Sequence, residues 1–125
     1  MKSKGFEELE VWKKAHNLTI EIYKLTKSFP ADERFGLVSQ MRRASISSGD
    51  GGERRYRKRG KKDKLNFYNI AQGSLDELKY YLILSKDIGY INDASRYLTL
   101  YDEVIRVLTS YMEKMLREAG SKSDK

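Results

Sequence analysis

Apolar residues recur at alternating steps of three and four along most of this chain, and this spacing strongly limits its possible folds. Side chains three or four positions apart lie on one face of an α-helix, whereas a strand needs alternation with a period of two. The positions that follow the helical spacing are Val11, Ala15, Leu18, Ile22, Leu25 and Phe29; Leu37, Met41 and Ala44; Phe67, Ala71, Ser74, Leu78, Tyr81, Ser85 and Ile88; and Tyr97, Tyr101, Val104, Leu108, Tyr111 and Met115. No stretch sustains the strand period, so the chain is predicted to be all-α.

Residues that favour helix ends separate the four segments. Pro30 disfavours helical geometry in Phe29, and the carboxylate of Asp32 suits the positive start of the next helix. Gly89 stands where a left-handed C-terminal residue belongs, and Asn92 is a candidate N-cap. We therefore expect helices over residues 6–29, 32–47, 61–88 and 92–117, followed by a frayed tail over 118–125.

Three glycines in four positions follow the second segment, in Ser47-Ser48-Gly49-Asp50-Gly51-Gly52. Each glycine costs a helix interior about 1 kcal/mol relative to alanine, because its backbone loses more freedom on folding. The sequence therefore predicts a helix break here and a glycine-rich, basic connector over residues 48–60.

Four helices with short connections predict one domain over residues 1–125, built as an antiparallel up-down-up-down four-helix bundle. The last two helices are apolar over more of their surface than one core needs. Tyrosine suits interfaces because it pairs a large apolar ring with a polar tip. The surplus indicates a homo-oligomer, with the interface candidates Trp12, Tyr80, Tyr81, Tyr97, Tyr101 and Tyr111. The alternative is a single bundle whose tyrosine rings only edge its core.

The excess positive charge of the chain is concentrated in one segment. The whole chain holds 25 Lys and Arg against 18 Asp and Glu, but residues 53–64 alone hold eight basic and two acidic residues. A focused cluster attracts polyanions, because Lys and Arg neutralise phosphates and release counterions. A tyrosine among these cations could stack on an exposed base. The candidate nucleic-acid contacts are Arg54, Arg55, Tyr56, Arg57, Lys58, Arg59, Lys61, Lys62 and Lys64.

Arg42 and Arg43 precede this basic segment and either extend the patch or form ion pairs with nearby carboxylates. The segment itself has alternative interpretations: a solvated loop, or a contact for a protein or an anionic membrane. No base-reading motif is visible, so nucleic-acid binding would depend on shape and charge more than on sequence.

The side chains needed for most enzymatic chemistry are scarce. The chain has no cysteine and a single histidine, His16, and Lys13 stands where a Glu-x-x-His metal motif would need its glutamate. No serine lies in a Gly-x-Ser-x-Gly turn, and residues 49–52 lack the Lys-Ser/Thr ending of a phosphate-binding loop. We therefore expect a non-enzymatic protein without metal or cofactor. No apolar run approaches the roughly 20 residues that span a bilayer, so we expect a cytoplasmic protein with no membrane partner.

Four ordered motifs resemble a known protein family. They are FEELEVWKKAH (6–16), YKLTKSFP (23–30), GLVSQMRRAS (36–45) and NIAQGSLDEL (69–78). These motifs are similar to those of the bacterial four-helix-bundle proteins encoded in 23S ribosomal RNA intervening sequences. The resemblance implies a bundle that assembles as a ring-like homopentamer. It also implies kinship with the accessory variability proteins of diversity-generating retroelements, which bind reverse transcriptase and nucleic acid through a basic surface.

The chain departs from the family's pattern over residues 48–55. Members usually carry a segment like Ile-Pro-Ala-Asn-Ile-Ala-Glu-Gly there, and its two isoleucines are replaced by Ser48 and Gly52. We therefore expect the end of the second helix to bury less surface. No role of the family's Asn and Glu in that segment carries over to this chain.

Two functional hypotheses follow from the sequence. The first is a homopentameric bundle that binds RNA, or a complex of nucleic acid and protein, through residues 53–64 together with Arg42 and Arg43. Its partners would be RNA, further copies of the chain, and a reverse transcriptase or another protein. The second is a structural or protein-interaction scaffold in which the basic segment is only a soluble connector.

Overall fold

Four long α-helices account for nearly all of the chain. The structure, a computed structural model, describes the backbone of residues 2–55 and 61–123 and the side chains of residues 9–49 and 64–118. The helices are α1 (Lys2–Thr26), α2 (Leu37–Arg55), α3 (Lys61–Asp87) and α4 (Ser95–Ser123), with a short 3₁₀ helix, η1 (Ala31–Glu33), between α1 and α2. The described residues contain no strand, and the prediction of an all-α protein with four helices is confirmed.

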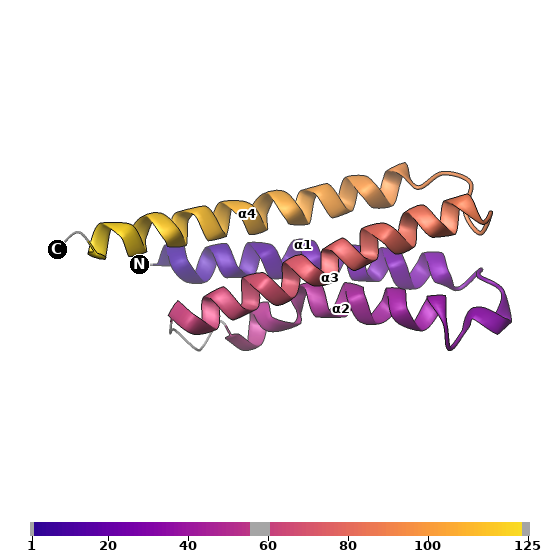
Figure 1. The fold of residues 1–125 in the computed structure, drawn as a ribbon, viewed down its shortest axis with the longest axis horizontal. Coiled ribbons are helices and arrows are strands. Elements are labelled where there is room, and N and C mark those ends of the chain that lie inside the picture. Colours follow the sequence, from indigo (N-terminus) through magenta and orange to yellow (C-terminus); the bar gives the residue numbers. More distant parts are fainter. Residues whose placement is uncertain (1, 56–60, 124–125) are drawn as a thin grey trace.

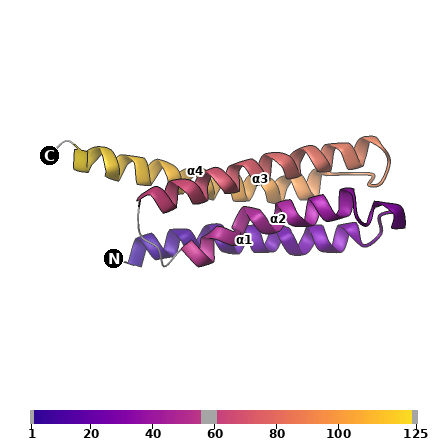
Figure 2. The same cartoon turned by 60° about the horizontal axis from the view of Figure 1, so that its bottom comes forward.

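The chain traverses the length of the molecule four times. Both termini lie at one end, and the turns after α1 and after α3 lie at the other (Figure 1). Figure 2 shows α1 beside α2 in one layer and α3 beside α4 in a second. Each helix packs against two neighbours, in the cyclic order α1, α2, α3, α4. The end that carries the termini therefore also carries the end of α2 and the start of α3.

The core lies between the two layers and contains most of the side chains that the spacing identified, whereas Ile88 is 48% exposed. Fully burying one aliphatic side chain stabilises a fold by about 1.5–3 kcal/mol. Among aromatic residues, Phe67 of α3 meets Tyr111 of α4 edge to face, with ring centroids 5.9 Å apart. The apolar side chains with no exposed surface are Val11, Ala15, Leu18, Ile22, Met41, Ala71, Leu75, Leu78, Leu82, Val104 and Leu108.

The second helix differs from its prediction at both ends. It was expected over residues 32–47, but Asp32 lies in η1 and α2 runs from Leu37 to Arg55. The first helix likewise ends at Thr26, before Phe29. The C-terminal residues expected to fray continue α4 as far as Ser123.

The predicted helix break at the glycines is wrong, because α2 continues through them. A Cβ atom added to Gly49 would lie only 2.7 Å from the Cβ of Ala15, well inside the 3.5–4.0 Å at which carbon atoms normally touch. The glycine therefore permits α2 to approach α1 closely. Ser48 is fully buried, contrary to expectation, and its hydroxyl donates a hydrogen bond to the Ser45 carbonyl at 2.7 Å. Close packing here compensates the low helix propensity of glycine.

The turn between α3 and α4 follows one prediction and corrects another. Gly89 has a φ of +90°, the left-handed conformation expected of a helix C-terminus. The N–H of Tyr90 donates back to the carbonyl of Ser85 at 2.8 Å, which closes the end of α3. At the start of α4, Asp93 rather than Asn92 accepts the hydrogen bond from the Ser95 N–H, at 3.0 Å.

A hydrogen bond joins the two turns at the end of the bundle opposite the termini. The Tyr90 hydroxyl donates to the Glu33 carboxylate at 2.7 Å, and the other oxygen of Glu33 accepts from the Leu37 N–H at 3.1 Å. The hydrogen bond from Tyr90 lowers the pKa of Glu33 most, and the bond from the Leu37 N–H lowers it further. The Glu33 carboxylate in turn raises the pKa of Tyr90. A Cβ on Gly36 would lie 3.1 Å from the Glu33 Oε1, a tight contact with the same carboxylate oxygen that accepts from Leu37.

This bond predicts a pH dependence of stability. Because the folded pKa of Glu33 is lowered, its contribution is complete above the unfolded pKa and is lost as pH falls through the folded value. Tyr90→Phe should lower the free energy of unfolding at neutral pH, and the difference from wild type should shrink on acidification. Urea unfolding followed by circular dichroism between about pH 7 and pH 3 measures this. The control Tyr68→Phe removes a hydroxyl that forms no hydrogen bond with any residue that the structure describes, and it should have little effect at either pH. A Tyr90→Phe difference of equal size at both pH values would contradict the prediction.

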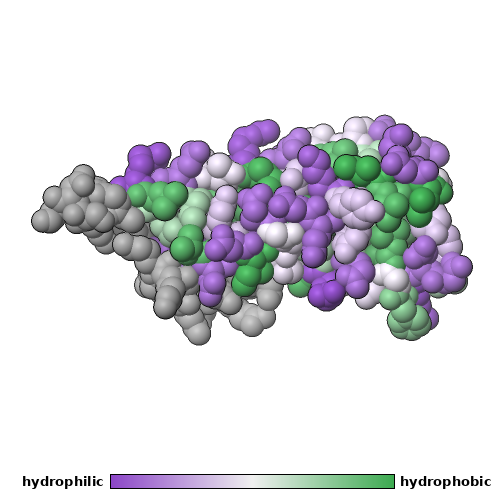
Figure 3. Space-filling view, in the orientation of Figure 1, coloured by the Kyte–Doolittle hydropathy of each residue, from purple (hydrophilic) through white to green (hydrophobic). Residues whose placement is uncertain are grey.

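The outer surface mixes apolar and polar side chains. On the face in Figure 3 the apolar areas are separated by polar ones, and the largest lies toward the end opposite the termini. None of the helices, over the residues described, has an apolar stretch long enough to cross a membrane.

Candidate nucleic-acid interface

The fold divides the basic segment between two helices. Arg54 and Arg55 form the end of α2, and Lys61 and Lys62 form the start of α3. These two helix ends lie at the same end of the molecule as both termini (Figure 1). The described backbone on either side of the gap, up to Arg55 and from Lys61, therefore lies at one end of the bundle. Of the predicted contacts, Tyr56, Arg57, Lys58 and Arg59 lie outside the described residues.

Lys64 is the basic-segment residue whose side chain is described, and it is buried. Only 7% of its surface is exposed, in the first turns of α3. A lysine buried to this degree has little surface with which to contact the phosphates of a nucleic acid. The prediction of Lys64 as a direct contact therefore has no support from its position.

Arg42 has a structural role between α1 and α2. Its Nε donates to the Thr26 hydroxyl at 2.9 Å, its Nη2 donates to the Tyr23 carbonyl at 3.4 Å, and its guanidinium lies 4.4 Å from the centre of the Tyr23 ring. Arg43 is exposed and donates to the Gln40 side chain at 2.9 Å. Neither arginine is paired with a carboxylate whose side chain is described, so the expected ion pairs are not found there.

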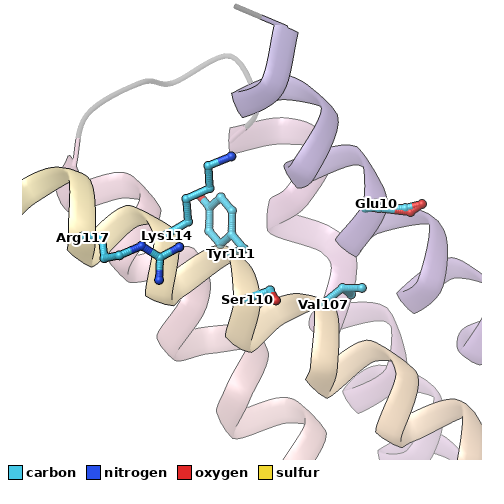
Figure 4. A pocket seen from close by; sticks show the side chains of 6 residues that line it. All are labelled: Glu10, Val107, Ser110, Tyr111, Lys114 and Arg117. Atoms are coloured by element: carbon cyan, nitrogen blue, oxygen red, sulfur yellow. The ribbon is translucent and has the colours of Figure 1, made fainter.

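A pocket that the sequence analysis missed opens between α1 and the last turns of α4. Its volume is about 270 Å³, and it is lined by Glu10, Val107, Ser110, Tyr111, Lys114 and Arg117. Figure 4 shows Lys114 and Arg117 at one end of this pocket and Glu10 at the other. The signal was present in the sequence, because the α4 residues recur at steps of three and four on one helix face. Two cations and two hydroxyls are thereby added to the end of the bundle that carries the basic segment.

Glu10 has an unusual environment within this pocket. Its Oε1 atom is buried and accepts no hydrogen bond from any residue that the structure describes. A buried polar atom without a partner is costly, commonly by about 1–3 kcal/mol.

Two of the predicted interface residues are already buried within the single chain. Tyr101 and Tyr111 are only 8% and 6% exposed and belong to the core of the single chain, where the packing of α4 on its neighbours covers them. Tyr81 and Tyr97 are half-buried against the same core. Tyr80, at 58% exposed, has the surface available for a second copy.

Trp12 and His16 stack on each other one turn apart on α1. Their ring centroids are 4.9 Å apart and their planes differ by 10°. Trp12 is half-buried and His16 is exposed. Within the described side chains, no cluster of three or more His, Asp or Glu could hold a metal ion.

Comparison with known families identifies the chain. A family model described as 23S rRNA-intervening sequence protein matches residues 7–110. The chain belongs to this family. The match covers α2, α3 and the basic segment of this 23S rRNA-intervening sequence protein, and it ends just before Tyr111, Lys114 and Arg117. A search of curated proteins finds no match to the chain.

Proposed function

We propose that this 23S rRNA-intervening sequence protein is a non-enzymatic RNA-binding bundle that contacts phosphates through the cations of residues 53–64. The observation that carries the proposal is the meeting of the end of α2 and the start of α3 at one end of the molecule. In the sequence, eight basic residues are concentrated in positions 53–64, and the remainder of the chain is almost neutral. A local excess of charge is what attracts a polyanion.

The pocket beside Lys114 and Arg117 is a second reason to place the binding surface at this end of the bundle. Lys114 and Arg117 lie on α4, whose C-terminal turns share this end with the basic segment (Figures 1 and 4). Arg42 and Arg43 lie earlier in α2, away from this end of the bundle, and Arg42 already bonds to α1. We therefore assign phosphate contact to the basic segment and the end of α4. Arg43 is exposed but lies apart from this surface.

A salt series tests the proposal. If about four cations of each protomer contact phosphates of a single strand, the logarithm of affinity should fall with the logarithm of salt at a slope of roughly −3. Affinity would then drop about 50-fold between about 50 and 200 mM salt. Fluorescence anisotropy with labelled single-stranded RNA, hairpin RNA and duplex DNA measures the slope and the preferred form. Absence of saturable binding at low salt would contradict the proposal and favour a protein scaffold.

We also propose that the bundles assemble as a ring-like homopentamer, as the family resemblance implies. The support in this chain is the outward side of α3, where several large apolar side chains remain uncovered: Ile70, Tyr80, Ile83 and Ile88. Light scattering should give about five times the chain mass of 14.6 kDa at micromolar concentration. Tyr80→Glu should reduce that mass, because a charge in an apolar interface is costly to desolvate. A monomeric wild type would contradict this assembly.

The partner and the location follow from the same proposal. A cytoplasmic ring with a basic end fits a complex of RNA and protein, and a reverse transcriptase is the protein class that the resemblance implies. No residue of the described chain is assigned to that protein contact.

A further inference from the structure

The stacked Trp12 and His16 rings border a small pocket on the outer side of α1 and α2. The pocket has a volume of about 140 Å³. Four residues of α1 and two of α2 line it, namely Trp12, Ala15, His16, Thr19, Ile46 and Gly49. This pocket is separate from the one beside Lys114 and Arg117.

Small residues at the bottom of the pocket and larger ones at its sides leave this space open. Ala15 and Gly49 are both buried and bring the two helices together without a large side chain between them. Trp12 and His16 stand on the α1 side, and Ile46 stands on the α2 side with 45% of its surface exposed. An apolar cavity of roughly 150 Å³ holds a benzene molecule. The space between these helices therefore suits one six-membered ring.

The two rings that border the pocket have unused polar groups. Among the residues that the structure describes, no hydrogen bond engages the ring nitrogens of Trp12 or His16. The indole N–H is a donor, and the imidazole nitrogens can donate or accept. A ligand that stacks a planar base on a ring face could therefore also form hydrogen bonds to these ring edges through its sugar or phosphate oxygens.

A third ring continues this surface along α1. Tyr23 lies seven residues after His16, which places it two turns farther along the same helix face. The Arg42 guanidinium covers it at 4.4 Å. We call Trp12, His16, Tyr23, Arg42 and Ile46 the α1–α2 face. From Trp12 to Tyr23 the helix rises about 16 Å, at 1.5 Å per residue.

The pocket also lies next to the basic segment. Arg54 follows Gly49 by five residues in the same helix, an axial distance of about 8 Å. Aromatic rings beside a cluster of cations are the combination by which proteins bind single strands without reading sequence. Bases of a duplex already stack on each other, so they cannot enter such a pocket.

We infer that the Trp12–His16 stack receives a base of a single-stranded nucleic acid whose phosphates contact the basic segment. This inference rests on the proposed function and deepens it by naming the form of nucleic acid that binds. The pocket's volume favours the single ring of a pyrimidine over a purine. The α1–α2 face continues from the stack to Tyr23 and Arg42, away from the basic segment, and no phosphate contact is assigned there.

Trp12 is the only tryptophan of the chain, so its fluorescence reports on this site directly. The probes are an oligouridine and an oligoadenosine of about 12 nucleotides and an RNA duplex of similar charge. The oligouridine should quench Trp12 fluorescence, and the duplex should not. His16→Ala should weaken oligouridine binding about tenfold in anisotropy, within the range for loss of one base–aromatic stack. The salt slope should stay unchanged, because no phosphate contact is removed.

A matched variant and the remaining outcomes make the test decisive. Phe35→Ala removes an aromatic ring that is 87% exposed in the turn before α2, and it should bind as wild type. Salt-dependent oligouridine binding with constant Trp12 fluorescence and no effect of His16→Ala would overturn the stacking site and leave the proposed function intact. No binding of any probe in anisotropy would overturn the proposed function as well. A Trp12 signal that changes with protein concentration alone would show that another subunit occupies the pocket, and this would also overturn the inference.

Discussion

Gly49→Val should lower the free energy of unfolding by about 2–3 kcal/mol, the upper part of the range for overpacking a well-packed contact. The first added carbon alone would lie 2.7 Å from the Cβ of Ala15, and α2 would have to move away from α1. That movement would also disturb the Thr19 hydroxyl, which donates to the Ser45 carbonyl at 2.9 Å across the same contact. Urea unfolding followed by circular dichroism measures the loss.

The same substitution in α3 supplies the control. A Cβ on Gly73 would meet nothing within 4 Å, so Gly73→Val should be neutral or slightly stabilising through its better helix propensity. A double-mutant cycle is a second test. Gly49→Ala adds a methyl group against Ala15, and Ala15→Gly removes the methyl group that it meets, so the double variant should be less destabilised than the sum of the two single variants. Equal effects of the two valine substitutions would show that helix propensity alone decides the stability at position 49.

Replacing seven cations of the basic segment with glutamine should weaken RNA binding at least about 100-fold at low salt and flatten the salt slope, because the electrostatic contribution supplies essentially all non-specific affinity. Lys64 is kept, since its burial makes it part of the packed fold. The substituted residues are Arg54, Arg55, Arg57, Lys58, Arg59, Lys61 and Lys62. Anisotropy measures the affinity, and circular dichroism confirms that the helices remain.

A variant with the same change in net charge controls for general electrostatics. It replaces seven exposed cations outside the segment, namely Lys13, Lys24, Lys27, Arg34, Lys79, Lys86 and Arg106. This variant should lose far less affinity when both are compared in about 0.1 M salt, because its charges are spread over the bundle and are screened beyond about 10 Å there. Equal losses in the two variants would show that net charge, and not the segment, determines binding.

The spacing of apolar residues predicted the helices and the core well, whereas helix ends were predicted poorly. Core positions such as Leu18, Leu78 and Leu108 follow from a period that the backbone imposes on every helix. The end of α2 depends instead on a neighbour, because the contact of Gly49 with Ala15 involves residues 34 positions apart. Local propensity disfavoured a helix there, and packing reversed that preference.

The candidate site shows the same division. The sequence identified the cations of residues 53–64, but it ranked Lys64 with the rest although the fold buries it. It assigned Tyr101 and Tyr111 to an interface, although both are buried in the core of the single chain. An apolar stripe on a helix has the same sequence pattern whether it packs in a core or against another subunit. The pocket of Lys114 and Arg117 was missed because it forms only where α1 packs beside α4, and Glu10 of α1 lines one side of it.

The sequence by itself determined the helical period, the basic segment and the family, since each is a property of residues close together in the chain or of ordered motifs. Only the tertiary structure decided where α2 ends, which tyrosines are buried, and that Trp12, His16 and Ile46 border one pocket. The physical reason is that these features arise from contacts between helices. The energy of such a contact depends on two surfaces at once, and a local pattern describes only one of them.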